Sequence, residues 1–145
     1  MARRSRQIRS ARSGSRQSRS PRHAADSDCP CGTGKTYSEC CGPLHAGTAG
    51  ADTAEALMRS RYSAFALGDA AYLLRTWHPE TRPARLDLDR DRRWTGLEIL
   101  ETSGGTAFHS SGTVAFRARY RDPEGPGAQE ETSEFLRLDG AWVYR

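Results

Sequence analysis

The chain has 145 residues, 36% of them hydrophobic and 28% charged, which is the size and composition of one soluble domain with short appendages. No apolar run approaches the roughly 20 residues of a membrane-spanning helix, so we expect no association with a membrane. No apolar stretch follows the basic N-terminus, so we expect no secretory signal peptide and a cytoplasmic location. In the cytoplasm, clustered cysteines bind metal or take part in redox chemistry more often than they form structural disulfides.

The net charge of +4 arises in residues 1–25. Eight of the 22 basic side chains lie there and none of the 18 acidic ones, which leaves 14 basic against 18 acidic residues in the rest of the chain. This Arg/Ser-rich segment has little to bury, so we expect a disordered tail. One interpretation is a dispensable extension upstream of the true start, and the other is an arm that binds nucleic-acid phosphates without sequence specificity. No aromatic residue is interleaved to stack on bases, which favours the first.

All four cysteines of the chain lie in the stretch CPCGTGKTYSECC, residues 29–41. Disulfides account for this stretch poorly, because the adjacent Cys40 and Cys41 could pair only with a distorted peptide bond. Four thiolates can instead hold one zinc ion in a tetrahedron, and Gly32 and Gly34 would allow the tight turn that this geometry requires. A site that is closed by four protein ligands is structural rather than catalytic.

The spacing of the cysteines leaves a second interpretation open. Only one residue separates the first two cysteines, whereas paired zinc ligands usually have two to four residues between them. On spacing alone, a redox-active dithiol therefore remains the alternative to zinc. Lys35 could offset part of the negative charge of four thiolates, and His45 is a spare ligand candidate. The prediction is one Zn²⁺ per chain, with the ligands Cys29, Cys31, Cys40 and Cys41.

Two helices are predicted after the cysteines. The first should begin near Asp52, whose side chain could cap the free amides while Glu55 completes a capping box. It should end at Gly68, because glycine suits the left-handed conformation at a helix C-terminus. Asp69 could cap a second helix over residues 70–78, which must stop before the proline that follows. One broad face of the first helix carries the apolar residues Leu57, Met58, Tyr62 and Phe65.

The second half of the chain predicts an antiparallel sheet. Residues 80–93 are charged and irregular and predict a loop, after which strands are expected at 97–100, 112–121, 130–138 and 141–145. Turns are expected at Gly104-Gly105, over 122–127, and at Asp139-Gly140, which is a strong hairpin signal. The second strand places Val114, Phe116, Ala118 and Tyr120 on one face. Helices followed by a meander indicate an α+β fold with the helices packed on one face of the sheet.

The cysteine stretch resembles the SEC-C motif, a zinc-binding segment at the end of the bacterial preprotein translocase motor SecA that also occurs in many unrelated proteins. This sequence departs from the motif at Thr33, where serine is usual, and so keeps the hydroxyl. The resemblance implies a zinc knuckle and suggests a protein partner such as a chaperone or a ribosomal surface. The matching residues are Cys29, Pro30, Cys31, Gly32, Gly34, Lys35, Tyr37, Cys40 and Cys41.

Three further stretches resemble the YchJ-type bacterial family: LMRSRYSAF, YLLRTWHP and EFLRLDGAWVYR. Members of this family carry a SEC-C motif followed by a nuclear-transport-factor-2-like (NTF2-like) domain, a cone of helices closed by a curved antiparallel sheet. The resemblance implies a SEC-C knuckle at 26–47 and the cone domain at 50–145, and the tail expected at 1–25 is not part of it. Some members have a second SEC-C motif after the last strand, which we do not expect here. The resemblance implies no particular reaction.

The cone implied by this resemblance could enclose a pocket. Tyr62, Trp77 and Trp94 could form apolar walls, while His78 and Glu131 could exchange protons near neutral pH. The same aromatic residues could equally be plain core, and a histidine before a proline could simply close a helix. Arg59 and Arg61 are about 200° apart on a helix, so at most one of them can face inward. The pocket candidates are Arg59, Arg61, Tyr62, Trp77, His78, Trp94 and Glu131.

The sequence favours a zinc-binding protein whose knuckle is a structural or protein-interaction module attached to the cone. We expect the cone to fold without metal, because it has its own capped helices and apolar sheet face. The alternatives are a small-molecule-binding domain or enzyme that uses the cone cavity, and non-specific nucleic-acid binding through residues 1–25. No nucleophile–base pair or phosphate-binding loop is visible, so the sequence favours a protein that is not an enzyme.

Overall fold

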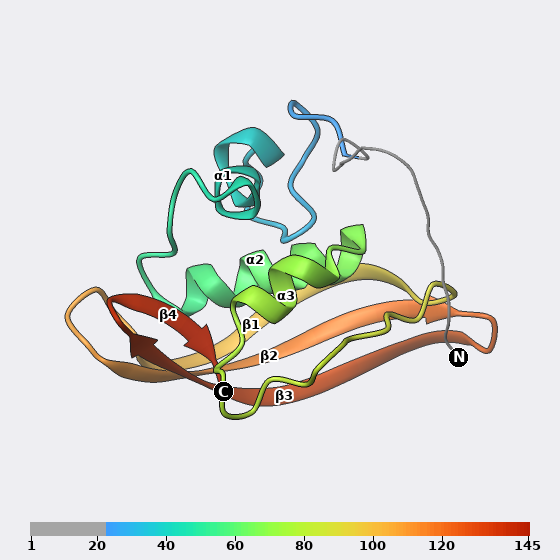
Figure 1. Ribbon diagram of the computed structural model, residues 1–145. Helices are drawn as coiled ribbons and strands as arrows, with labels where there is room; N and C mark the ends of the chain where they lie inside the picture. Colours follow the sequence, from blue (N-terminus) through green and yellow to red (C-terminus); the bar gives the residue numbers. More distant parts are fainter. Residues whose placement is uncertain (1–22) are drawn as a thin grey trace.

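Three α-helices precede a four-stranded antiparallel sheet in the computed structural model, which describes residues 23–145 (Figure 1). The predicted α+β class is confirmed, whereas the predictions for residues 1–22 lie outside the described residues. None of the helices in the described part is long and apolar enough to cross a membrane. The elements are a 3₁₀ helix η1 (Tyr37–Glu39), α1 (Cys41–Ala46), α2 (Ala54–Leu67), α3 (Ala70–Arg75), β1 (Arg93–Gly104), β2 (Ser111–Asp122), β3 (Gly125–Leu138) and β4 (Ala141–Tyr144).

The sheet is a meander in which each strand pairs with the next one in sequence. The predicted hairpin at Asp139-Gly140 is confirmed, with φ angles of 53° and 85° that suit the two central residues of a hairpin turn. The turn between β2 and β3 is tighter than the predicted 122–127, because Asp122 already pairs with Gly125. β1 begins at Arg93, earlier than the predicted 97–100, because its first residues pair with the end of β2.

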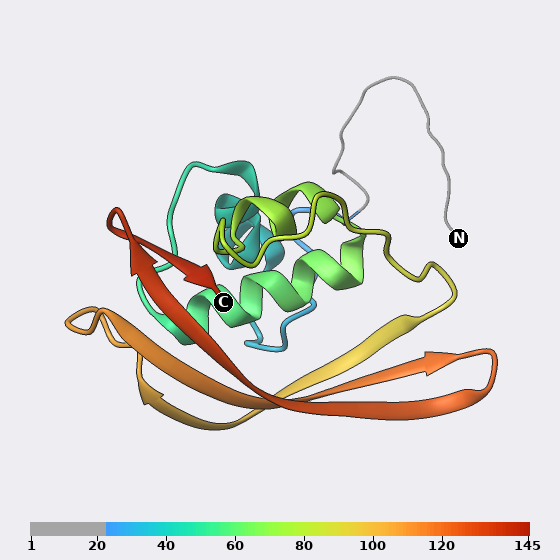
Figure 2. The same cartoon turned by 60° about the horizontal axis from the view of Figure 1, so that its bottom comes forward.

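Side chains of β2 alternate between the two faces of the sheet as predicted. Val114, Phe116 and Ala118 are buried, whereas Arg119 and Arg121 are exposed. The buried face packs against α2, which the sheet curves around, and all three helices lie on this concave side (Figure 2). The apolar face of the strands, where every second residue is buried, and the apolar face of α2, where the spacing is near 3.6 residues, therefore pack together in one core.

The start of α2 differs from the prediction. Thr53, rather than Asp52, is the N-cap, and its side chain accepts a hydrogen bond from the backbone N–H of Ala56 at 3.0 Å. Glu55 forms no capping box and instead pairs with Arg59 at 3.0 Å, one helical turn along. The predicted C-terminus is confirmed, since Gly68 has a left-handed conformation with φ of 78°.

The Thr53 cap provides a test of this correction. Thr53→Ala is expected to lower the free energy of unfolding by about 1 kcal/mol, because a backbone donor in the first turn loses its acceptor. Asp52→Ala is the matched control and should change it by about half a kcal/mol or less. Urea unfolding followed by circular dichroism would measure both values. A larger loss of stability for Asp52→Ala than for Thr53→Ala would show that Asp52 is the N-cap.

The second helix is shorter than predicted. Asp69 caps it as expected, accepting from the backbone N–H of Tyr72 at 3.0 Å, but α3 ends at Arg75 and does not reach residue 78. The chain that follows pairs with the end of β4 instead. The N–H of Tyr144 donates to the carbonyl of Thr76 at 2.8 Å, and the N–H of His78 donates to the carbonyl of Tyr144 at 2.7 Å. A sheet partner distant in sequence therefore replaces the last helical turn.

Candidate functional sites

The four cysteine sulfur atoms converge at one point between the N-terminal segment and α2. All four lie within 4.8 Å of one another, with Cys31 and Cys40 3.5 Å apart and Cys40 and Cys41 4.0 Å apart. A tetrahedral metal with sulfur ligands at about 2.3 Å would separate the sulfur atoms by about 3.8 Å. The four thiols therefore fit a metal ion of this kind, and they could hold one.

The local chain conformation explains how closely spaced cysteines converge. Residues 28 and 36 form an isolated antiparallel bridge, and the N–H of Cys29 donates to the carbonyl of Lys35 at 2.9 Å. Gly32 and Gly34, inside this loop, have φ angles of 84° and 88°, which glycine adopts without strain. η1 and the first turn of α1 then place Cys40 and Cys41 close to Cys29 and Cys31. The tight turn predicted from the two glycines is present.

Hydroxyl groups surround the sulfur atoms. The Thr33 hydroxyl lies 3.2 Å from the sulfur of Cys40, and the Ser63 hydroxyl of α2 lies 3.4 Å from the sulfur of Cys41. Hydrogen bonds from Cys29 and Cys41 lower the pKa of the Cys31 thiol far below its ordinary value. The sequence reasoning missed Ser63, although a small polar residue on the buried side of an amphipathic helix was a signal for it.

The cysteine segment is joined to α2 by polar contacts. Arg59 donates from Nη1 to the carbonyl of Cys31 at 2.8 Å. His45 donates from Nε2 to the carbonyl of Ser60 at 2.8 Å, and its Nδ1 accepts from the hydroxyl of Tyr37 at 2.6 Å. Both ring nitrogens are thus used, so His45 is a structural link and not a fifth metal ligand. Burial raises the pKa of Tyr37 to about 12, which keeps its donating proton in place.

Apolar packing joins the same segment to the core of the domain. Cys29, Cys31 and Cys41 are 4%, 0% and 2% exposed, and they belong to the core cluster that contains Leu57 and Val114. Only Cys40 is partly exposed. The packing therefore argues against a separable knuckle and favours one that completes the core.

Residues 23–25, which we expected to belong to the disordered tail, also contact the cysteine segment. The backbone N–H of Ser38 donates to the carbonyl of Ala25 at 2.9 Å. His23 lies with Nε2 2.7 Å from the carbonyl oxygen of Asp28, and its ring packs edge-on against Tyr37 at 5.3 Å. Residues 23–25 thus lie with the cysteine segment, because they find hydrogen-bond partners in it.

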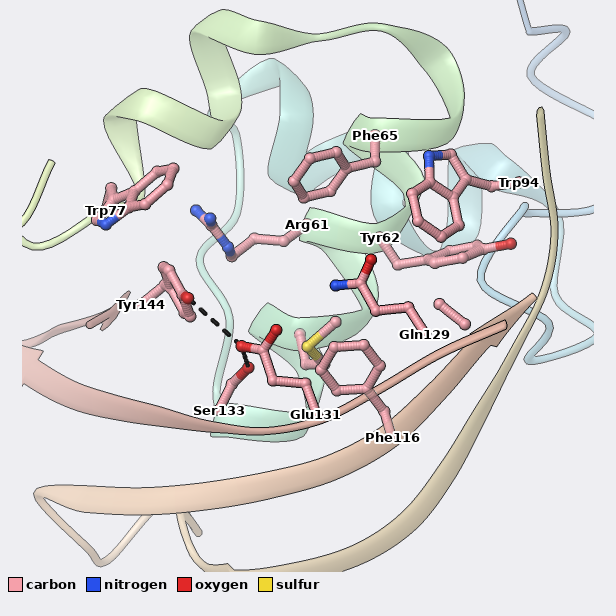
Figure 3. A pocket seen from close by; sticks show the side chains of 12 residues that line it. Arg61, Tyr62, Phe65, Trp77, Trp94, Phe116, Gln129, Glu131, Ser133 and Tyr144 are labelled. Atoms are coloured by element: carbon pink, nitrogen blue, oxygen red, sulfur yellow. Dashed lines mark hydrogen bonds between the residues drawn. The ribbon is translucent and has the colours of Figure 1, made fainter. Parts of the chain in front are cut away.

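A second candidate site is a pocket of about 230 Å³ between α2 and the concave face of the sheet (Figure 3). Of the predicted pocket residues, the structure brings together Arg61, Tyr62, Trp77, Trp94 and Glu131. It excludes Arg59, which faces the cysteine segment. The expectation that at most one of the two arginines faces inward is confirmed.

His78 is also outside the pocket, so the predicted proton exchange with Glu131 is wrong. Its Nδ1 accepts a hydrogen bond from the backbone N–H of Glu80 at 3.0 Å, in the turn after α3. The shortening of α3 moves His78 away from the helix end on which the prediction was based. Glu131 instead accepts from the hydroxyl of Ser133 at 2.7 Å and from that of Tyr144 at 3.5 Å.

Several lining residues were missed. Gln129 and Ser133 share the face of Glu131, because side chains two positions apart on β3 point the same way. That period-two rule, applied outward from Glu131, was the available signal. Tyr144 reaches the pocket from β4, which no pattern in the sequence indicated. The remaining lining residues are Met58, Phe65, Phe116 and Ala118.

Comparisons with known proteins agree with both parts of this architecture. A family model described as the middle, NTF2-like domain of YchJ matches residues 53–145, and the SEC-C motif matches residues 27–43. The solution structure of RPA3114, a SEC-C motif-containing protein from Rhodopseudomonas palustris, has a TM-score of 0.71 at 41% identity, covering 80% of this chain and 93% of that one. A SEC-C motif-containing protein from Psychrobacter arcticus gives a TM-score of 0.70 at 30% identity, covering 83% and 81%.

Sequence relatives extend the comparison. A UPF0225 protein of Streptomyces coelicolor is 66% identical over 116 residues, which cover 80% of this chain and 90% of the relative. A UPF0225 protein of Streptomyces avermitilis is 57% identical and aligns with 94% of this chain, so the alignment reaches into the basic segment 1–25. The fold and the cysteine cluster define an NTF2-like domain preceded by a SEC-C motif. The chain belongs to the YchJ-type family, whose relatives are named UPF0225 proteins.

Proposed function

We propose that this is a zinc-binding protein in which the SEC-C motif is a structural element of the cone domain. The metal would be held by Cys29, Cys31, Cys40 and Cys41, and it would fix the cysteine segment against α2. Zinc is the metal that four thiolates in a closed tetrahedral set suit best, because it tolerates this geometry and does not cycle between oxidation states.

The observation that carries this proposal is the burial of three candidate ligands in the same core as α2 and β2. A thiolate buried among apolar side chains is costly unless a cation compensates its charge. A metal ion would supply that compensation, and the hydroxyls of Thr33 and Ser63 would orient and further stabilise the sulfur atoms. The polar links from Arg59 and His45 to this segment support a fixed position on α2 and not a loosely tethered module.

Metal analysis of protein purified under reducing conditions tests the proposal. We expect one zinc per chain, and Cys40→Ser should reduce this to a small fraction, because three thiolates and a hydroxyl bind zinc much more weakly. Ser38→Ala, an exposed position in the same segment, is the matched control and should retain one zinc. His45→Gln should also retain it, because His45 contacts Tyr37 and Ser60 and not the sulfur atoms.

The redox interpretation makes the opposite prediction. Protein without zinc in which two of the cysteines form a reversible disulfide would contradict the proposal and identify a dithiol. Thiol titration under native conditions separates the two cases further. Zinc-bound thiolates, three of them buried, should react slowly, whereas a redox dithiol should react at the partly exposed Cys40 first.

A further inference from the structure

The pocket between α2 and the sheet contains a buried cation with unused hydrogen-bond donors. Arg61 is only 4% exposed, and its Nη1 donates to the carbonyl of Leu73 at 2.8 Å and to the hydroxyl of Thr76 at 2.7 Å. Within residues 23–145, no group accepts a hydrogen bond from its Nε or Nη2. These two nitrogens form the parallel pair of N–H groups with which arginine binds a carboxylate in bidentate fashion.

The orientation of Arg61 is fixed by its neighbours. Its guanidinium carbon lies 4.5 Å from the ring centroid of Tyr144 and 5.2 Å from that of Trp77. Burial lowers the pKa of Arg61 to about 10, so the group is still a cation at neutral pH. The free edge of the guanidinium is therefore a preorganised binding group that needs no rearrangement to meet a ligand.

A carboxylate faces the same cavity from the sheet. Figure 3 shows Arg61 extending from α2 on one side of the pocket and Glu131 rising from β3 on the other. No ion pair joins the two among the described residues. A simple anion would be repelled by Glu131 and a simple cation by Arg61. A ligand that carries both charges would be attracted by both groups.

The rest of the pocket is apolar and aromatic. The rings of Tyr62 and Phe65 each lie 6.2 Å from that of Trp94 in edge-to-face contact, and Phe116 lines the pocket from the sheet. The volume of about 230 Å³ is below the roughly 300–1,000 Å³ of drug-sized pockets, which limits the ligand to about the size of an amino acid. Aromatic walls favour a flat apolar body in the ligand.

We propose that this pocket binds a small aromatic zwitterion of the amino-acid class. Its carboxylate pairs with the Nε and Nη2 groups of Arg61, its ammonium group faces Glu131, and its ring packs among Tyr62, Phe65 and Trp94. The site is independent of the cysteine cluster, so this inference does not rest on the proposed zinc function. It is a binding site and implies no reaction, because His78 lies outside it.

Three matched probes test the proposal on the full chain: L-phenylalanine, 3-phenylpropionate and 2-phenylethylamine. The second lacks the ammonium group and the third lacks the carboxylate. Isothermal titration calorimetry should show L-phenylalanine binding about tenfold or more tightly than either analogue, because each analogue leaves either Arg61 or the half-buried Glu131 without its charged partner. The fluorescence of Trp77 and Trp94 should report the same event, because both line the pocket.

Glu131→Gln keeps the shape of the side chain and removes its charge. This variant should bind L-phenylalanine no more tightly than 3-phenylpropionate. The matched control is Glu130→Gln, the same change at the next residue, which points to the convex face and pairs with Arg117. It should retain the preference of the unmodified protein. Arg61→Lys should weaken L-phenylalanine about tenfold, because lysine has no parallel pair of donors.

Three outcomes would overturn the proposal. The absence of heat and of a fluorescence change with all three probes at millimolar concentration would make Arg61 a purely structural link between α2 and α3. L-phenylalanine and 3-phenylpropionate could bind the unmodified protein equally, which would exclude a role for Glu131. Glu130→Gln could alter binding as much as Glu131→Gln does. If Arg61→Lys does not fold, the probe series and the two glutamate variants still decide the question.

Discussion

Removal of the proposed zinc ion is expected to destabilise the entire described chain and not only the cysteine segment. Without the ion, Cys29, Cys31 and Cys41 remain in a core that they share with Leu57 and Val114, and the free energy of metal binding no longer stabilises that core. We expect a loss of several kcal/mol, which for a domain of this size lowers the melting temperature by on the order of 10 °C or more. Thermal unfolding with and without a strong chelator measures this.

This expectation replaces the one from the sequence, in which the cone folds independently of metal. Cys31→Ser should reproduce the effect of the chelator, and the chelator should then have no further effect on that variant, because both remove the same ion. Far-ultraviolet and near-ultraviolet circular dichroism should change in one transition. Persistence of the native melting temperature after chelation would show that the knuckle contributes little to the core, and it would revive the interpretation of a separable docking module.

The second large effect is expected from a core phenylalanine. Phe135 on β3 is 1% exposed, and its ring lies 5.9 Å from that of Tyr144. Phe135→Ala should lower the free energy of unfolding by about 3–5 kcal/mol, because it removes buried apolar atoms and leaves a cavity. Urea unfolding measures the change, with an unchanged dependence on urea concentration if the unfolded state is unaffected.

The chain provides a matched control for this prediction. Phe108, in the loop between β1 and β2, is 98% exposed, so Phe108→Ala deletes the same atoms from a side chain in contact with water. It should change the free energy of unfolding by no more than about 0.5 kcal/mol. Equal effects at the two positions would mean that β3 does not pack against the helices in solution as described here.

The features that the sequence predicts correctly are those set by local chemistry. The glycine at the end of α2, the aspartate before α3 and the Asp139-Gly140 hairpin all act within a few residues of their own position. The alternation along β2 is equally local. The convergence of the four thiols was also predictable, because a single short stretch contains every cysteine of the chain.

The features that the sequence misses depend on contacts between distant segments. The end of α3 is determined by Tyr144, which lies far along the chain and offers its backbone groups to Thr76 and His78. The attachment of the cysteine segment to α2 depends on His45 and on Ser63. The sequence around these two residues does not indicate which groups they contact. The prediction of His78 as a pocket residue was wrong for the same reason. It assumed that the helix continues to residue 78, whereas pairing with β4 ends α3 earlier.

The meander order of the sheet also bears on how fast the protein folds. Because each strand pairs with its sequence neighbour, the hairpins close short loops, and little chain entropy is lost before the first contacts form. Docking of the cysteine segment onto α2, and pairing of β4 with the chain after α3, join parts of the molecule that are remote in sequence. We therefore expect early formation of the hairpins and a later, slower step in which the helices and the thiol cluster settle onto them. The appearance of a cobalt–thiolate absorption band during refolding with Co²⁺ in place of zinc would time that last step.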